Sequence, residues 1–141
     1  MSNYKIRISA KGFFFNSKNE VLLVLGTTKK DGKSFYCAPG GGAEEGENLF
    51  RAVERELVEE TGFSGKASKV VFCQDLKYFA NRCFEVFFIG KLDEVKKRQE
   101  EFDHKTKFVS KEEFENIEFY PKGINPFKLR AIEGVDYKTC L

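Results

Sequence analysis

The fold of this chain is decided by residues 41–63, which run from Gly41 to Phe63 and read GGAEEGENLFRAVERELVEETGF. Strong helix formers fill most of this stretch, and Gly62 stands where a left-handed residue commonly ends a helix. Its apolar residues recur every three or four positions, which is the period of an amphipathic helix. They are Leu49, Phe50, Val53 and Leu57. The pattern predicts a helix over residues 47–61 with one apolar stripe facing the core.

Three glutamates of this helix, Glu56, Glu59 and Glu60, crowd one side of it about one turn apart. Like charges at this spacing destabilise an isolated helix by about a few tenths of a kcal/mol per pair. One interpretation is a solvated face that is balanced by Arg51 and Arg55. The other is a divalent cation, and Mg²⁺ prefers carboxylate and carbonyl oxygens in octahedral geometry.

The order of residues around these glutamates resembles the signature of the Nudix hydrolase family, whose members are MutT-like. That signature is Gly, five residues, Glu, seven residues, Arg-Glu, an aliphatic residue, any residue, Glu-Glu, any residue, Gly and an apolar residue. Every specified place is filled, by Gly41, Glu47, Arg55, Glu56, Leu57, Glu59, Glu60, Gly62 and Phe63. The resemblance implies an α/β fold, an α/β/α sandwich with a mixed β-sheet, and residues 1–141 are expected to form a single Nudix hydrolase domain.

The resemblance also implies an activity, a Mg²⁺-dependent pyrophosphohydrolase for which Mn²⁺ is the other candidate metal. The expected substrate is a nucleoside diphosphate linked to another moiety, such as a nucleotide, ADP-ribose or a nucleotide sugar. Water attacks a phosphorus of the diphosphate, and catalysis depends on positioning and on charge stabilisation. By the same resemblance, Glu59 and Glu60 are direct metal ligands, Glu56 is a ligand or the general base, and Gly40 offers its carbonyl to the metal.

Two further roles follow from the resemblance. Arg55 is expected to pair with the carboxylate of Glu47 and so hold the glutamates in place, although a plain surface ion pair is the alternative. A further acid is expected from the loop before the last strand. Glu101 is the choice there, with Glu100 and Asp103 as alternatives.

The rest of the chain predicts strands around this helix. Alternation at residues 4–15, with Ile6, Ile8 and Ala10 on the inner side, favours a half-buried strand, and residues 21–25, 34–38, 67–76 and 82–92 also favour strands. Residues 94–107 are dense in charge and favour a loop. Ser110 and Glu113 form a capping-box pattern, and residues 125–132 favour a last amphipathic segment. Strands without strict alternation with helices indicate a mixed sheet.

The composition of the chain argues against some classes of binding partner. The 141 residues carry 24 basic and 22 acidic side chains, a net charge of +2, so a nucleic-acid backbone is an unlikely ligand. The N-terminus has no signal-like apolar segment, no run approaches membrane-spanning length, and four sparse cysteines indicate free thiols. A cytoplasmic protein is expected, and the family resemblance adds a possible homodimer.

Substrate choice stays open in the sequence. One alternative is a non-catalytic nucleotide-sensing Nudix module, which the complete signature disfavours. A dinucleoside polyphosphate hydrolase is another, to which Tyr78 alone points, and an RNA 5′-end pyrophosphohydrolase is a third. A base has several candidate stacking partners, each of which is equally plausible as core. These are Phe35, Tyr36, Phe79 and Tyr120.

Overall fold

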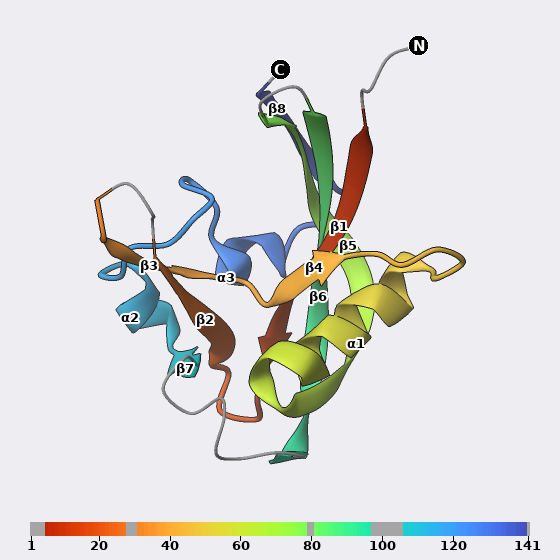
Figure 1. Ribbon diagram of the computed structural model, residues 1–141. Helices are drawn as coiled ribbons and strands as arrows, with labels where there is room; N and C mark the ends of the chain where they lie inside the picture. The colour runs from red at the N-terminus through yellow and green to blue at the C-terminus, as the bar shows by residue number, and fades with distance from the viewer. Residues whose placement is uncertain (1–4, 28–30, 79–80, 97–105, 141) are drawn as a thin grey trace.

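A computed structural model describes residues 5–27, 31–78, 81–96 and 106–140 of the chain (Figure 1). The strands are β1 (Ile6–Phe15), β2 (Val21–Thr27), β3 (Ser34–Cys37), β4 (Gly40–Gly42), β5 (Phe63–Tyr78), β6 (Asn81–Lys96), β7 (Thr106–Val109) and β8 (Asp136–Cys140). The helices are α1 (Leu49–Thr61), α2 (Lys111–Phe114) and α3 (Pro126–Leu129).

The strands form one mixed sheet in the order β3-β2-β1-β6-β5-β8, with β4 paired to β1 and β7 paired to β2. Two of the pairings are parallel, β1 with β6 and β5 with β8, and the others are antiparallel. Strands β1 and β2 pair at Phe15↔Val21, beside the hairpin turn, and beyond this pair the two strands diverge (Figure 1). The middle of β1, residues 9–11, pairs with β4 instead, which brings the glycine turn into the middle of the molecule.

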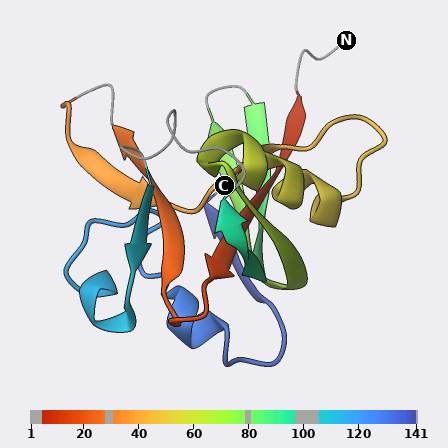
Figure 2. The same ribbon diagram turned by 90° about the horizontal axis from the view of Figure 1, so that it is seen from below.

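Helices cover both faces of the sheet, with α1 on one face and α2 and α3 on the other (Figure 2). The core under α1 contains Phe14, Val53, Leu57 and Phe88 among its buried residues. The core on the opposite face is rich in aromatic rings, which stack or meet edge to face. Its phenylalanines are Phe13, Phe15, Phe72, Phe87, Phe114, Phe119 and Phe127. The expected α/β/α sandwich with a mixed sheet is therefore confirmed.

Helix α1 begins two residues later than the sequence predicts. The Asn48 side chain accepts a hydrogen bond from the Arg51 N–H at 2.9 Å, so Asn48 caps the helix and Glu47 stays in the preceding loop. The end is as predicted, because Gly62 has a left-handed φ of 76° and its N–H bonds the Val58 carbonyl.

Several strand predictions need correction. Ile6 and Ile8 are exposed rather than buried, because the core under α1 starts at Ala10 and leaves the first half of β1 uncovered. The predicted loop over residues 94–107 is partly strand. Backbone pairing of Lys96 with Phe63 extends β6, and residues 106–107 belong to β7. Strand β8 was not predicted at all.

Two apolar positions were predicted wrongly: Phe50, expected on the core-facing stripe of α1, is 43% exposed, and Ile132 lies beyond the end of α3 and is also 43% exposed. Other local predictions hold. Ser110 caps α2 with the full capping box, in which Glu113 is the reciprocal partner. Asn125 caps α3, and Phe127 and Leu129 are buried as expected. Cys37, Cys73 and Cys83 are free thiols. Within the described ranges, no helix has both the length and the hydropathy that crossing a bilayer requires.

We expect Leu57→Ala to lower the free energy of unfolding by about 2–5 kcal/mol, because its fully buried side chain would leave a cavity between α1 and the sheet. Urea denaturation measures the loss. Leu25→Ala is the matched control: Leu25 is 38% exposed on β2, and its loss should be about 1 kcal/mol or less. Equal losses for the two variants would contradict this assignment of the core.

Candidate active site

The site forms where the glycine turn is pressed between β1 and α1. Strand β4 pairs with β1 so that Gly41 lies opposite Ala10 and Gly40 opposite Lys11. A Cβ atom at Gly41 would lie 2.7 Å from the Glu56 carboxylate, and one at Gly40 would lie 2.2 Å from the Ala10 carbonyl oxygen. Only residues without a side chain permit these approaches. The glycines therefore set the distance between the helix and the strand.

Glu60 is partly buried, whereas Glu59 is exposed. Its Oε2 accepts a hydrogen bond from the Gly40 N–H at 2.9 Å. Burial raises the pKa of Glu60 above its ordinary value, while the Gly40 N–H and the positive charge of Lys11 act in the opposite direction. The site thus holds a carboxylate in an environment that favours neutralising its charge.

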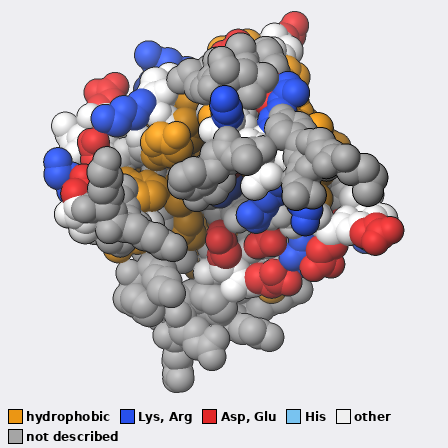
Figure 3. Space-filling model, turned by 45° about the horizontal axis from the view of Figure 1, so that its top comes forward, with side chains coloured by type: hydrophobic (Ala, Val, Ile, Leu, Met, Phe, Trp, Pro, Cys, Tyr) orange, Lys and Arg blue, Asp and Glu red, His pale blue; other side chains and the backbone are white. Residues whose placement is uncertain are grey.

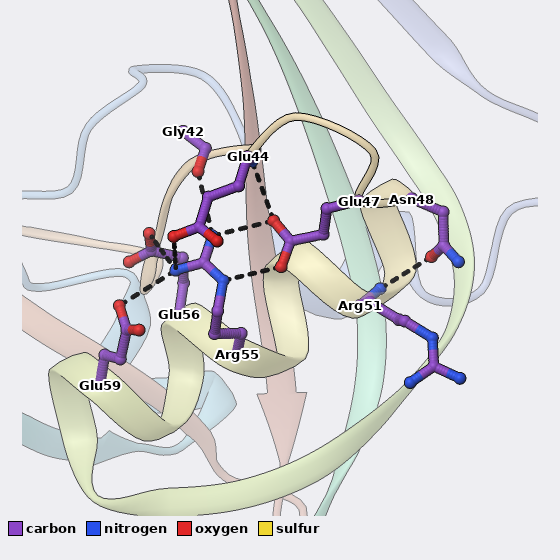
Figure 4. A network of polar contacts seen from close by, with 8 residues as sticks. All are labelled: Gly42, Glu44, Glu47, Asn48, Arg51, Arg55, Glu56 and Glu59. Atoms are coloured by element: carbon purple, nitrogen blue, oxygen red, sulfur yellow. Dashed lines mark hydrogen bonds and ion pairs between the residues drawn. The ribbon is translucent and has the colours of Figure 1, made fainter.

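Arg55 gathers the other acids of the site, as Figure 4 shows. Its Nε donates to Glu47 Oε2 at 2.7 Å and its Nη2 donates to Glu47 Oε1 at 3.0 Å, which is a bidentate pair. Its Nη1 lies 3.1 Å from both Glu56 Oε1 and Glu59 Oε2. Nη2 also bonds the Gly42 carbonyl at 3.2 Å. One guanidinium thereby connects the helix to the glycine turn.

The expected pairing of Arg55 with Glu47 is present and is tighter than a plain surface ion pair. The two side chains are 24% and 14% exposed. The Arg55 hydrogen bonds and, to a smaller extent, the Glu44 N–H, which donates to the same carboxylate at 3.0 Å, together lower the pKa of Glu47 to about 2. Because this folded-state pKa is depressed, the stabilising effect is present above the ordinary pKa of a glutamate and is lost as the pH falls towards 2.

The donor set suits a hard cation such as Mg²⁺, since Glu56, Glu59 and Glu60 offer carboxylate oxygens from a single helix turn. In the described ranges, no three His, Cys, Asp or Glu residues converge on one point, because Glu56 and Glu59 face Arg55 while Glu60 faces the Gly40 N–H. Binding a metal would therefore require these side chains to turn.

Two expected metal ligands remain predictions. Gly40 contacts the site through its N–H, and the role expected of its carbonyl is untested. Glu101, with its alternatives Glu100 and Asp103, lies outside the described residues.

Sequence reasoning missed three contributors to the site. Lys11 reaches the surroundings of Glu60 through the pairing of β1 with β4, and a strand register of this kind leaves no signal in a single sequence. Glu44 and the Gly42 carbonyl join the Arg55 network from the glycine turn. Glu44 and Gly42 could have been found from the sequence, because both lie inside the loop of the signature segment.

A glycine turn held against an acidic helix, on a mixed sheet between helical layers, defines a class of small α/β domains. A family model described as NUDIX domain matches residues 5–131, and the chain belongs to this family. Nudix hydrolase 5 of Arabidopsis thaliana is 30% identical over 137 residues, which are 92% of this chain and 45% of that protein. Nudix hydrolase 6 of the same plant is 31% identical over 109 residues, 71% of this chain and 38% of that protein. The chain thus spans less than half the length of these relatives.

Solved structures share the fold at low sequence identity. The Escherichia coli ORF135 protein superposes with a TM-score of 0.67 at 18% identity, over 93% of this chain and 95% of that one. A UDP-X diphosphatase superposes with a TM-score of 0.70 at 16% identity, over 98% of this chain and 69% of that one. An ADP-ribose pyrophosphatase from Streptococcus suis superposes with a TM-score of 0.62 at 17% identity, over 94% of this chain and 98% of that one.

We expect Arg55→Lys to weaken Mg²⁺ binding by about 10- to 100-fold, because lysine cannot hold Glu47 bidentately while also contacting Glu56 and Glu59. Isothermal titration calorimetry with MgCl₂ measures the affinity. Arg51→Lys is the matched control, since the Arg51 side chain points away from the cluster (Figure 4). Unchanged Mg²⁺ affinity in Arg55→Lys would show that the network does not prepare a metal site.

We expect Glu60→Gln to stabilise the metal-free protein, because glutamine still accepts from the Gly40 N–H but carries no buried charge. The folded-state pKa of Glu60 is raised, so wild type loses stability as the pH rises through that pKa and the variant does not. In EDTA, the gain in melting temperature should therefore be larger at pH 8 than at pH 4. Excess Mg²⁺ should then raise the melting temperature of wild type more than that of the variant. A variant that is less stable than wild type at pH 8 in EDTA would contradict the burial argument.

Proposed function

We propose that this chain is a Mg²⁺-dependent pyrophosphohydrolase that cleaves a nucleoside diphosphate linked to another moiety. The observation that carries the proposal is the Arg55 network, which holds Glu47, Glu56 and Glu59 on one side of α1 beside the glycine turn. A solvated acidic face does not need a partly buried arginine with bidentate geometry. The family membership of residues 5–131 supports the same conclusion.

The residues divide the work as follows. Glu59 and Glu60 would hold Mg²⁺, which would supply charge neutralisation for the diphosphate oxygens. Arg55 keeps Glu56 and Glu59 beside the glycine turn, and the Gly40 N–H keeps Glu60 there, so that only a turn of the side chains would be needed to reach the metal. The carboxylate that is not engaged as a ligand accepts the proton of the attacking water, and Glu56 is the candidate. The bond between phosphorus and the bridging oxygen breaks as the bond from water to phosphorus forms.

The net charge and two solved structures of the same fold support a choice of substrates to test. A nearly neutral chain suits a small anion better than a nucleic-acid backbone. Among the proteins of the same fold are a UDP-X diphosphatase and an ADP-ribose pyrophosphatase. We therefore place nucleotide sugars and ADP-ribose first among the substrates to be tried.

The test is ion-exchange chromatography of products after incubation with Mg²⁺ and a panel of ADP-ribose, nucleotide sugars, nucleoside triphosphates and diadenosine polyphosphates. Wild type should cleave one class, and EDTA should abolish the cleavage. We expect Glu56→Gln and Glu59→Gln to lower kcat by about 10²- to 10⁴-fold through loss of a base or a metal ligand.

Glu45→Gln is the matched control, because Glu45 is an exposed acid of the glycine loop. It should retain wild-type turnover. A folded wild type that cleaves nothing in the panel would overturn the proposal and favour a sensing module, which calorimetry would reveal as tight binding of an uncleaved nucleotide.

A further inference from the structure

Two basic residues of β1, Arg7 and Lys11, lie beside the glycine turn. They are four residues apart with Ser9 between them, so their side chains lie on one face of the strand. Ser9 pairs with Gly42, and Lys11 pairs with Gly40, where β1 meets β4. Within the part of the chain that the structure describes, neither basic side chain has a hydrogen bond or an ion pair. Both are therefore available to an anion.

Lys11 is withdrawn from water although no carboxylate is bonded to it. Among the lysines whose exposure the structure describes, it alone is partly buried, and lysines are mostly exposed unless they are paired. Burial raises the pKa of Glu60 and of the Cys37 thiol, and the nearby charge of Lys11 opposes the rise in both groups. Cys37 ends β3, which main-chain bonds between Tyr36 and residues 118–120 hold in place. Lys11 thus occupies a confined position close to the acidic cluster.

Arg7 approaches the glycine turn from the side opposite to the glutamates. A Cβ atom at Gly42 would lie 3.2 Å from both Nε and Nη2 of Arg7, whereas a Cβ atom at Gly41 would lie 2.7 Å from the Glu56 carboxylate. Successive residues of a strand point to opposite faces. The turn therefore has an acidic side, which faces α1, and a basic side, which consists of Arg7 and Lys11.

One acid shares this face of the sheet, Glu85 of β6, which pairs with Ser9. Its Oε1 accepts a hydrogen bond from Gln74 Nε2 at 2.6 Å, and in the described ranges it forms no ion pair with Arg7 or Lys11. The basic side of the turn therefore keeps its positive charge.

A diphosphate needs such charge here, because the acidic cluster repels it. Arg55 already contacts four carboxylates, so its charge is not available to the substrate. Lysine, arginine and metal ions are the groups that stabilise negative charge on phosphoryl oxygens. Figure 3 shows basic side chains directly beside a group of acidic side chains on one face of the molecule.

We propose that Lys11 and Arg7 bind the diphosphate oxygens that the metal does not hold, an inference that rests on the proposed function. The diphosphate would then lie along the glycine turn, with the glutamates on one side and the two cations on the other. Cα atoms four residues apart in a strand are roughly 13 Å apart. Two cations at this spacing suit two adjacent phosphate groups better than a single phosphate.

The first experiment measures binding of inorganic diphosphate by isothermal titration calorimetry in metal-free buffer, where only the protein can supply positive charge. We expect Lys11→Gln and Arg7→Gln each to weaken binding by about 10- to 100-fold, because each removes a charged hydrogen-bond donor. Lys18→Gln is the matched control, since Lys18 is exposed in the turn at the far end of β1. No binding by wild type, or an equal loss in Lys18→Gln, would overturn the proposal.

Titration with MgCl₂ separates contact with the substrate from mere support of the cluster. Lys11 repels a cation near Glu60, so Lys11→Gln should bind Mg²⁺ at least as tightly as wild type while it binds diphosphate more weakly. Lys11→Arg keeps the charge and should retain most of the diphosphate binding. Loss of both Mg²⁺ and diphosphate affinity in Lys11→Gln would assign Lys11 a structural role and contradict the proposal.

Steady-state kinetics keeps this test separate from the proposed activity. On a substrate that wild type cleaves, Lys11→Gln should raise KM by about 10- to 100-fold with a smaller change in kcat, because the contact is already made in the bound substrate. Binding of diphosphate that depends on Lys11, in a protein that cleaves nothing, would support the basic side while the proposed function fails. Cleavage with the wild-type KM in both Lys11→Gln and Arg7→Gln would overturn the basic side alone.

Discussion

The close approach of the glycine turn to α1 is the constraint on which the rest of the site depends. Gly41 leaves room for the Glu56 carboxylate, and the Gly40 N–H reaches Glu60 at 2.9 Å. Strand β4 can occupy this position because β1 separates from β2 after the hairpin and offers its free side. A side chain at Gly40 would meet the β1 backbone at Ala10 and Lys11, and one at Gly41 would displace the Glu56 carboxylate, so either change would disturb the acidic cluster.

The acidic cluster around Arg55 carries more negative than positive charge. Arg55 is in contact with four carboxylates, those of Glu44, Glu47, Glu56 and Glu59, so one positive charge faces four negative charges. Glu60 stands apart from Arg55 and has the Gly40 N–H as its hydrogen-bond partner. An excess of negative charge that is partly removed from water is costly unless a cation offsets it. The place where α1 meets the glycine turn therefore has an excess of negative charge that a bound cation would offset.

Features that depend on residues close together in the sequence were predicted, whereas features that depend on pairing of distant strands were not. The helix and its Gly62 end follow from spacing within one segment, and the Arg55 contact with Glu47 follows from the resemblance of that segment to the family signature. The exposure of Ile6 and Ile8 could not be predicted, because alternation shows which side a residue faces but not how far a helix covers that side. Lys11 entered the site through a strand register, and β8 pairs with β5 across about 60 residues of sequence. Such long-range pairings leave no periodic signal.

The segment beside β3 is held by hydrogen bonds between main-chain atoms of Tyr36, Glu118 and Tyr120. These bonds are indifferent to the side chains that project from the same residues. Replacing the rings at positions 35 and 120 would leave this scaffold and the distant glycine turn untouched. Substitutions at these two positions can therefore change the surface chemistry beside β3 while the course of the main chain is kept.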